Sequence, residues 1–200
     1  MCLLLETIKI VDGEIQNLEY HNRRFNSSRR ALFSSTVDLD LSSLIRIPED
    51  LGNAIFRCRV LYRHKVESVE FIPHKPRTIK CLKLLTVDDI DYSFKYADRD
   101  QLESLYARRG DCDEILIVKG GFITDTSSGN IVFQLSDGAW VTPDTPLLKG
   151  TMRMFLLETG QIRETVLRPA DLGRFNAARM INCLRGLEEG PPIEMDRILR

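Results

Sequence analysis

The chain has 200 residues, 43% of them hydrophobic and 28% charged, and its formal net charge is −1. These proportions are typical of a globular protein with a full core, and the length suits one large domain or two small ones. A net charge this close to zero gives no overall attraction to nucleic acid or to a membrane surface, and no stretch approaches the roughly 20 apolar residues of a membrane span. We therefore expect neither partner.

Cysteine and histidine positions argue against a disulfide framework and a metal site. The five cysteines are odd in number and show no CxxC spacing. We expect reduced thiols, with Cys58 and Cys81 serving as small core residues. The apolar run at residues 3–5 is too short for a signal peptide, which favours the cytoplasm. The three histidines are scattered and predict no metal ligands.

The first half of the chain predicts an antiparallel sheet with one or two helices packed on it. Residues 3–11 have the pattern of a strand, and Asp12-Gly13 predicts a hairpin turn into a second short strand. Residues 19–34 predict a helix. Apolar and polar residues alternate on both sides of His64-Lys65, which predicts a β-hairpin, and residues 78–87 add a further strand.

The second half predicts strands with helices between them. The expected helices cover residues 98–109, 151–159 and, in a shorter form, 169–175. Strands are expected within residues 113–125, 129–143 and 179–184, the last of these being the final buried strand. The composition changes at residues 87–93. We therefore predict a small N-terminal domain at 1–88, a linker at 89–94 and a larger C-terminal domain at 95–200.

Two residues of the second half lie in contexts that suit chemistry. Lys95 stands between the aromatic residues Phe94 and Tyr96, although a solvated surface lysine is the alternative interpretation. Asp125 lies in a tight turn of small residues, Thr-Asp-Thr-Ser-Ser-Gly, where an ordinary turn-forming aspartate is the alternative. Glycine and small hydroxyl residues let a backbone approach a ligand closely, so this turn is a candidate binding segment.

Two further segments suit a phosphate group. Gly150 and Thr151 combine a glycine and a hydroxyl at a predicted helix start, where backbone N–H groups attract anions. Arg24 adds a guanidinium from the first predicted helix, with a solvated helix face as the alternative. A lysine for a Schiff base, an acid for a pyridinium nitrogen and a divided phosphate cradle are the parts needed to hold pyridoxal phosphate.

At these residues the sequence resembles the fold-type IV pyridoxal-phosphate enzymes, or class IV aminotransferases. The matching segments occur in the family's order: LLETIKIVDGEIQNLEYHNRRF, FKYADR, DEILIVKGGFITDTSSGNIVF and VTPDTPLLKGTMR. The resemblance implies an α+β fold of two domains, a small N-terminal α/β sandwich and a larger C-terminal β-barrel-like domain with helices. It also implies a homodimer that acts on a small-molecule amino substrate.

The resemblance also implies roles for individual residues. Lys95 would form the Schiff base with pyridoxal 5′-phosphate and later move the proton at the substrate α-carbon, and Asp125 would pair with the ring nitrogen. Other contacts to the cofactor are expected from Arg24, Gly150, Thr151, Met152, Asn182 and Cys183. Contacts to the substrate are expected from Arg57, Arg59 and Arg99, although a polar outer sheet face explains the first two equally well.

Two reactions and one non-enzymatic role stay open. The spacing of Lys95 and Arg99, the segment RMINCL at residues 179–184 and the short chain favour 4-amino-4-deoxychorismate lyase of the folate pathway, which yields 4-aminobenzoate and pyruvate. A class IV aminotransferase for branched-chain or D-amino acids is the alternative, and a truncated, non-catalytic paralogue is the second. Asp125 stands where most members of the family have glutamate, which leaves the substrate open.

Overall fold

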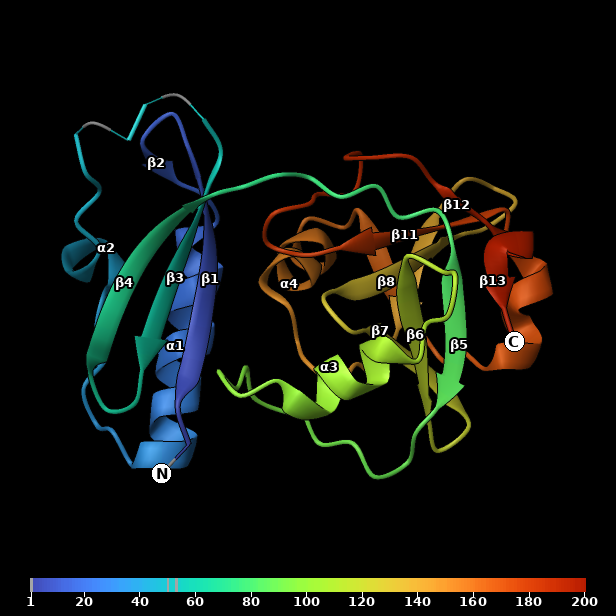
Figure 1. Ribbon diagram of the computed structural model, residues 1–200, viewed down its shortest axis with the longest axis horizontal. Coiled ribbons are helices and arrows are strands. Elements are labelled where there is room, and N and C mark those ends of the chain that lie inside the picture. Colours follow the sequence, from blue (N-terminus) through green and yellow to red (C-terminus); the bar gives the residue numbers. More distant parts are fainter. Residues whose placement is uncertain (1, 50, 53) are drawn as a thin grey trace. The chain divides into compact units, whose positions relative to one another are not determined.

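The computed structural model describes residues 2–49, 51–52 and 54–200, which divide into two compact units (Figure 1). Unit 1 comprises the residues up to Pro76 together with Phe94–Asp98. Unit 2 comprises Arg77–Ser93 and Arg99–Arg200. In the described residues, no helix is both long enough and apolar enough to cross a membrane.

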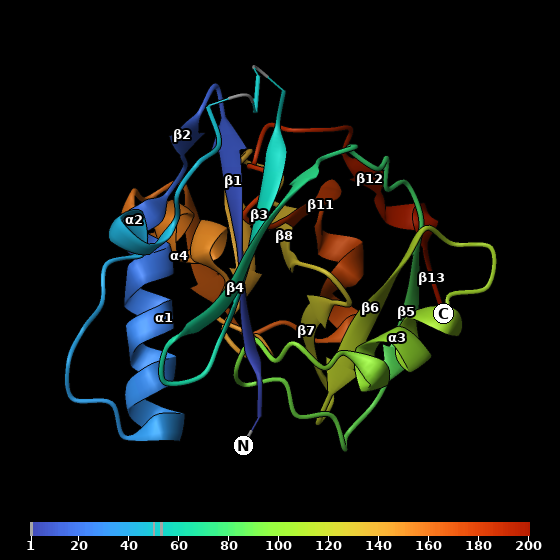
Figure 2. The ribbon, with the colours of Figure 1, turned by 60° about the vertical axis from the view of Figure 1, so that its left-hand side comes forward.

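Unit 1 is an antiparallel sheet of four strands with a long helix on one face, as Figures 1 and 2 show. The strands lie in the order β2-β1-β3-β4. Their bounds are β1 (Leu4–Val11), β2 (Glu14–Ile15), β3 (Phe56–Tyr62) and β4 (Val66–Pro73), and the helices are α1 (Leu18–Phe33) and α2 (Leu41–Leu44). The core forms where alternate residues of β1 and β3 meet the apolar face of α1, because successive strand residues point to opposite faces.

Unit 2 is built on a larger mixed sheet in the order β10-β9-β8-β7-β6-β5-β13, with β11 paired to both β8 and β12. Its strands are β5 (Leu82–Thr86), β6 (Glu114–Lys119), β7 (Phe122–Thr126), β8 (Asn130–Gln134), β9 (Trp140–Pro143), β10 (Ile162–Thr165), β11 (Ala177–Ile181), β12 (Ile193–Glu194) and β13 (Ile198–Leu199). Its helices are α3 (Asp100–Ala107) and α4 (Thr151–Glu158), and its 3-10 helices are η1 (Pro169–Arg174) and η2 (Met195–Arg197). Strands β6 to β8 are almost wholly buried and supply much of the core.

The order of the predicted elements is confirmed, but the division of the chain differs from the predicted domains 1–88 and 95–200. Strand β5 was expected in the small domain, yet it pairs in parallel with β6 and so belongs to unit 2. The segment Phe94–Asp98 belongs to unit 1, because Leu4 forms a β-bridge with Tyr96. The strand within 179–184 is not the final one, since β12 and β13 follow it.

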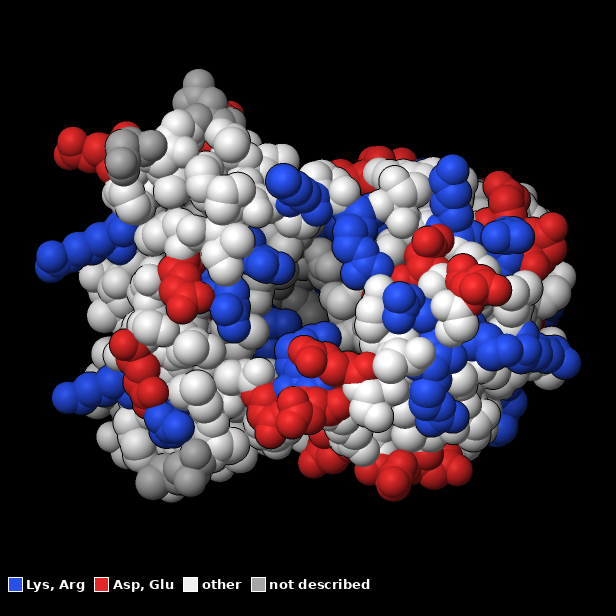
Figure 3. All heavy atoms as spheres, viewed as in Figure 1, with Lys and Arg blue, Asp and Glu red and all other residues white. Residues whose placement is uncertain are grey.

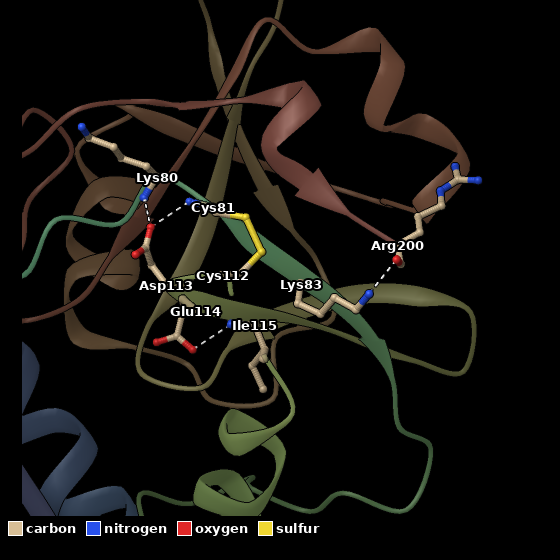
Figure 4. The surroundings of a disulfide bond; sticks show 8 residues. All are labelled: Lys80, Cys81, Lys83, Cys112, Asp113, Glu114, Ile115 and Arg200. Carbon is tan, nitrogen blue, oxygen red and sulfur yellow. Dashed lines mark hydrogen bonds between the residues drawn. A yellow bond between two sulfur atoms is a disulfide. The ribbon is translucent and has the colours of Figure 1, made fainter. Parts of the chain in front are cut away.

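Cys81 and Cys112 form a disulfide, so the expectation of reduced thiols is wrong for this pair (Figure 4). Cys81 immediately precedes β5, and Cys112 lies just before β6. Because these strands run in parallel and begin side by side, they bring the two cysteines together with their Cα atoms 4.8 Å apart. Cys58 is a free, buried thiol in the core of unit 1, as expected.

Candidate functional site

Asp125 lies near the end of β7 with its carboxylate buried and hydrogen-bonded at both oxygens. Oδ1 accepts a hydrogen bond from Asn130 Nδ2 at 2.7 Å, and Oδ2 accepts one from the backbone N–H of Leu148 at 2.9 Å. Asn130 begins β8 directly opposite Asp125 and donates a second bond to the Leu148 carbonyl at 2.9 Å. The acid is therefore fixed between a tight turn and the loop that precedes α4.

The environment of Asp125 brings the pKa of its carboxyl group close to neutral pH. Burial raises the pKa of Asp125 to about 6, against the hydrogen bonds from Leu148 and Asn130 and the charge of Arg153, which lower it. Arg153 is itself only 2% exposed and donates to Glu164 and to the Pro143 carbonyl. A cationic N–H group placed against Asp125 would favour the charged carboxylate, because opposite charge offsets the cost of burial.

The start of α4 lies one side chain away from Asp125. A Cβ atom on Gly150 would come 2.1 Å from Oδ1 of Asn130, the residue that also contacts Asp125, so only glycine fits at this position. Gly150 has no side chain with which to cap the helix, and Thr151 and Met152 follow it as buried residues of the first turn. Backbone N–H groups at a helix start, together with a hydroxyl, form a site that suits an anion.

Two residues predicted to contact ligands bind the turn after Asp125. Arg99, expected to contact substrate, donates from Nη2 to the Ser127 carbonyl at 2.8 Å and from Nη1 to the Tyr92 hydroxyl at 3.3 Å. Asn182, expected near the cofactor, donates to the Ser128 carbonyl at 3.1 Å. The next residue, Cys183, is partly exposed and is not in a disulfide. The structure thus brings Arg99 and Asn182 to the segment that carries Asp125.

Unit 1 holds a cluster of its own around a fully buried acid, Glu6 of β1. Arg24 of α1 donates to Glu6 through Nε at 2.8 Å and Nη2 at 2.6 Å, and His21 Nδ1 lies 2.7 Å from Oε2 of the same carboxylate. Burial alone would raise the pKa of Glu6, but the charge and hydrogen bonds of Arg24 and His21 outweigh it and lower the pKa to about 2. Glu6 is therefore a carboxylate that fixes the plane of the Arg24 guanidinium.

Lys95 is attached through its backbone to the strand that carries Glu6. Its carbonyl accepts from the Leu5 N–H at 2.9 Å, and Ala97 N–H donates to the Leu3 carbonyl at 2.9 Å. Burial lowers the pKa of His21 against its bond to Glu6, and the charges of Arg24 and Lys95 lower it further. The structure thus groups Lys95 with Arg24 around His21.

Arg57 and Arg59 lie on β3 at positions that alternate with the buried residues Cys58 and Val60. Arg59 forms a cross-strand ion pair with Glu70 of β4, with Nη1 and Oε2 3.2 Å apart. The Nε atom of Arg57 is buried and has no hydrogen-bond partner among the residues that the structure describes. Contact of either arginine with substrate stays a prediction.

The sequence analysis did not identify four residues that support the Asp125 segment: Glu114, Ser127, Ser128 and Asn130. Asn130 carried a usable signal, because it is a polar residue at the head of an apolar strand. Glu114 carried a weaker signal, as an acid at the start of a strand that is otherwise apolar up to Lys119.

On the surface, Figure 3 shows acidic and basic side chains interspersed, with no extended area of one sign on the visible face.

Comparisons with known proteins identify the family of the chain. Residues 93–188 match the family model for class IV amino-transferases. An uncharacterised protein of Haemophilus influenzae is 39% identical over 186 residues, which are 92% of this chain and 98% of that protein. A solved structure from Haemophilus somnus, provisionally named a 4-amino-4-deoxychorismate lyase, is 34% identical with a TM-score of 0.86, over 94% of this chain and 98% of that one.

More distant structures share the fold. A protein from Mesorhizobium loti, provisionally named an amino-acid aminotransferase, is 21% identical with a TM-score of 0.79, over 97% of this chain and 98% of that one. The pyridoxal-phosphate-bound form of a hypothetical aminotransferase from Mycobacterium tuberculosis is 19% identical with a TM-score of 0.76, over 92% of this chain and 78% of that one. From the family match and the relatives that align over nearly its whole length, the chain is a member of the class IV aminotransferase family of enzymes, with the fold-type IV architecture.

Proposed function

We propose that this enzyme is a pyridoxal-phosphate-dependent 4-amino-4-deoxychorismate lyase that forms 4-aminobenzoate and pyruvate. The observation that carries the proposal is the buried Asp125 carboxylate, which is held by Asn130, the residue that also packs against Gly150 at the start of α4. The provisional name of the Haemophilus somnus relative, which is 34% identical, supports the choice of reaction.

The residues fit the chemical groups of pyridoxal phosphate. The N-terminal amides of α4 and the Thr151 hydroxyl suit the phosphate, and Asp125 suits a protonated ring nitrogen, whose charge would offset the burial that raises the pKa of this acid. Lys95 supplies an amine for the aldehyde. The chemistry gained with this cofactor is a covalent imine to an amine and a sink for electrons from the carbon next to the substrate nitrogen.

Each residue then has a defined task in the proposed reaction. Lys95 removes the proton from the substrate carbon that bears the amine, which requires the neutral form of its own amine. Asp125 would place a negative charge beside the ring nitrogen and so favour its protonated form. Arg24, whose plane is set by Glu6, adds positive charge for the phosphate.

Elimination needs few further groups once that proton has left. The bond between the substrate ring and the enolpyruvyl oxygen breaks, the ring becomes aromatic, and the released enolpyruvate takes up a proton to become pyruvate. A class IV aminotransferase would instead return the proton to the cofactor and require a keto acid in a second half-reaction. The spacing of Lys95 and Arg99 and the segment RMINCL at residues 179–184, which resemble the lyase branch of the family, favour elimination.

The test supplies 4-amino-4-deoxychorismate alone and, separately, a panel of L- and D-amino acids with 2-oxoglutarate or pyruvate. We expect 4-aminobenzoate and pyruvate in equal amounts without any keto acid, and no product from the Lys95→Ala variant. Turnover that requires a keto acid would instead identify an aminotransferase. Borohydride reduction should attach the cofactor to Lys95. Attachment at Lys149 would refute the assignment of the lysine. Absence of any bound cofactor would favour the non-catalytic alternative.

A further inference from the structure

Glu114, the first residue of β6, is a fully buried acid to which the proposed reaction assigns no task. Its carboxylate accepts three hydrogen bonds. Oε1 accepts from the Ser127 hydroxyl at 2.6 Å and from the Ile115 N–H at 2.9 Å, and Oε2 accepts from the Ser128 hydroxyl at 2.8 Å. A buried acid is costly unless its oxygens are bonded in this way, so the two serines and Glu114 hold one another in place.

Ser127 and Ser128 form the tip of the turn that joins Asp125 to Asn130. The turn is closed from within by Thr126, whose N–H and hydroxyl both donate to the Gly129 carbonyl, at 2.9 and 2.8 Å. Asp125 and Asn130 are register partners at the two ends of this turn. A shift of the turn tip therefore moves both the Asp125 carboxylate and the Asn130 amide that binds it.

The turn has little space in which to shift while its contacts are intact. A Cβ atom on Gly129 would come 2.5 Å from the carbonyl oxygen of Ile181, so β11 approaches the turn as closely as glycine permits. Arg99 and Asn182 each donate to one carbonyl of the turn. Glu114 differs from these two because it binds the side chains of two consecutive turn residues from within the sheet.

We propose that Glu114 is a positioning residue, which acts through Ser127 and Ser128 to set the place of the Asp125 carboxylate at the ring nitrogen of pyridoxal phosphate. The proposal rests on the proposed function. Electrostatic sites of this kind tolerate displacements of only about 0.5 Å, so a turn that loses two of its side-chain anchors would weaken the contact to the ring nitrogen. The phosphate donors at α4 are not part of this turn, and their contribution is common to both ligands of the test below.

The test measures the dissociation constants of two ligands, pyridoxal phosphate and its analogue with a carbon atom in place of the ring nitrogen. Both carry the same aldehyde and phosphate, so the ratio of the two constants reports the contact to the nitrogen alone. We expect the wild-type protein to prefer pyridoxal phosphate by about 10- to 100-fold, the range of a charge-assisted hydrogen bond. Asp125→Ala sets the ratio that remains when this contact is lost.

Glu114→Ala should bring the ratio close to that of Asp125→Ala, whereas Glu114→Gln, whose amide can still bind both serine hydroxyls, should restore most of the preference. Ser128→Ala removes a single anchor and serves as the second variant should Glu114→Ala fail to fold, and it should lower the ratio part of the way. Thr142→Val is the matched control, because it removes one buried hydrogen bond, to the Ile131 carbonyl, in the same sheet. It should lower stability and leave the ratio unchanged.

The outcomes separate the two proposals. In one outcome, the wild-type protein prefers pyridoxal phosphate, and the Glu114→Ala and Ser128→Ala variants keep the same preference while binding both ligands more weakly. This result shows that Glu114 only stabilises the fold, and it overturns the inference. A wild-type protein that binds both ligands alike, or neither, refutes the task assigned to Asp125 and the inference together.

Discussion

Glu6→Gln tests the buried cluster of unit 1, because it removes the negative charge and keeps the size of the side chain. Glu6 is fully buried and the Arg24 side chain is 10% exposed, so the variant leaves a guanidinium without its counter-charge. Removing one partner of such a pair typically costs about 3–5 kcal/mol. The pKa of Glu6, lowered from 4.5 to about 2 by Arg24 and His21 against the effect of burial, corresponds to about 3 kcal/mol at 1.36 kcal/mol per unit.

The same shift fixes the pH range of the effect. Since the pKa of Glu6 is lower in the folded protein, its contribution is present above pH 4.5 and is lost as the pH falls through about 2. The difference between wild type and variant should therefore shrink over this range. His21, which faces Glu6, Arg24 and Lys95, also has a lowered pKa, so protonating it costs stability, and this loss begins below pH 6.5.

The assay is urea unfolding at several pH values, followed by circular dichroism and by tryptophan fluorescence. Trp140, the single tryptophan of the chain, lies on β9 of unit 2, whereas circular dichroism reports on the helices and strands of both units. We expect Glu6→Gln to lower the free energy of unfolding by about 3 kcal/mol at pH 7.

The control is Glu19→Gln on α1, where the acid is 77% exposed and lies 3.8 Å from Arg23. An exposed pair of this kind contributes at most about 1 kcal/mol. The argument is wrong if Glu6→Gln costs no more than this control at pH 7, or if the difference from wild type persists undiminished at pH 3.

Four further predictions concern unit 2 and assembly. Asp125→Asn should keep the cofactor but lose about two to three powers of ten in turnover, and near-normal turnover would show that Asp125 is only a turn residue. Burial raises the pKa of Asp125 from 3.8 to about 6. Without cofactor, the contribution of Asp125 to stability is therefore present below pH 3.8 and is lost as the pH rises through 6. In urea unfolding, the wild type should lose about 3 kcal/mol of stability relative to Asp125→Asn between pH 4 and pH 7. Gly150→Ala should cost about 1–3 kcal/mol by overpacking against Asn130 and should weaken cofactor binding measured by absorbance titration, whereas Gly173→Ala, with no atom within 4 Å of the added carbon, should do neither. We expect a homodimer in sedimentation, as the family resemblance implies, and a fully active monomer at all concentrations would contradict it.

Local pattern was sufficient to predict most of the strands and helices. Alternation over β3 and β4 predicted their hairpin, and glycine followed by a hydroxyl predicted the start of α4. The pairing of β5 with β6 was not predictable in the same way, because a parallel pair is joined by a crossover and leaves no turn signal. This missed pairing also explains the wrong expectation for Cys81 and Cys112, which meet only because the two strands begin side by side.

Candidate site residues could be named from the sequence where a short motif carries them, whereas the distant residues that support them could not. Asp125, Gly150 and Lys95 follow from short segments whose order matches the family. Glu114 and Glu6 lie 13 and 18 residues from the side chains they bind, Ser127 and Arg24. A single sequence shows that such acids lie in strands, but it does not show which donors the fold brings to them.

The path of the chain limits which segments of this protein can be exchanged with those of a relative. The backbone leaves unit 1 after Pro76, returns to it for Phe94–Asp98 and leaves again, and this short return carries Lys95. Its hydrogen bonds go to Leu3 and Leu5, at the opposite end of unit 1 in sequence. A single cut near residue 76 therefore separates the lysine from the strand edge that holds its backbone. A chimera that exchanges the first 76 residues would pair the Lys95 segment with a strand from another protein. The segment Phe94–Asp98 must therefore be exchanged together with the first 76 residues.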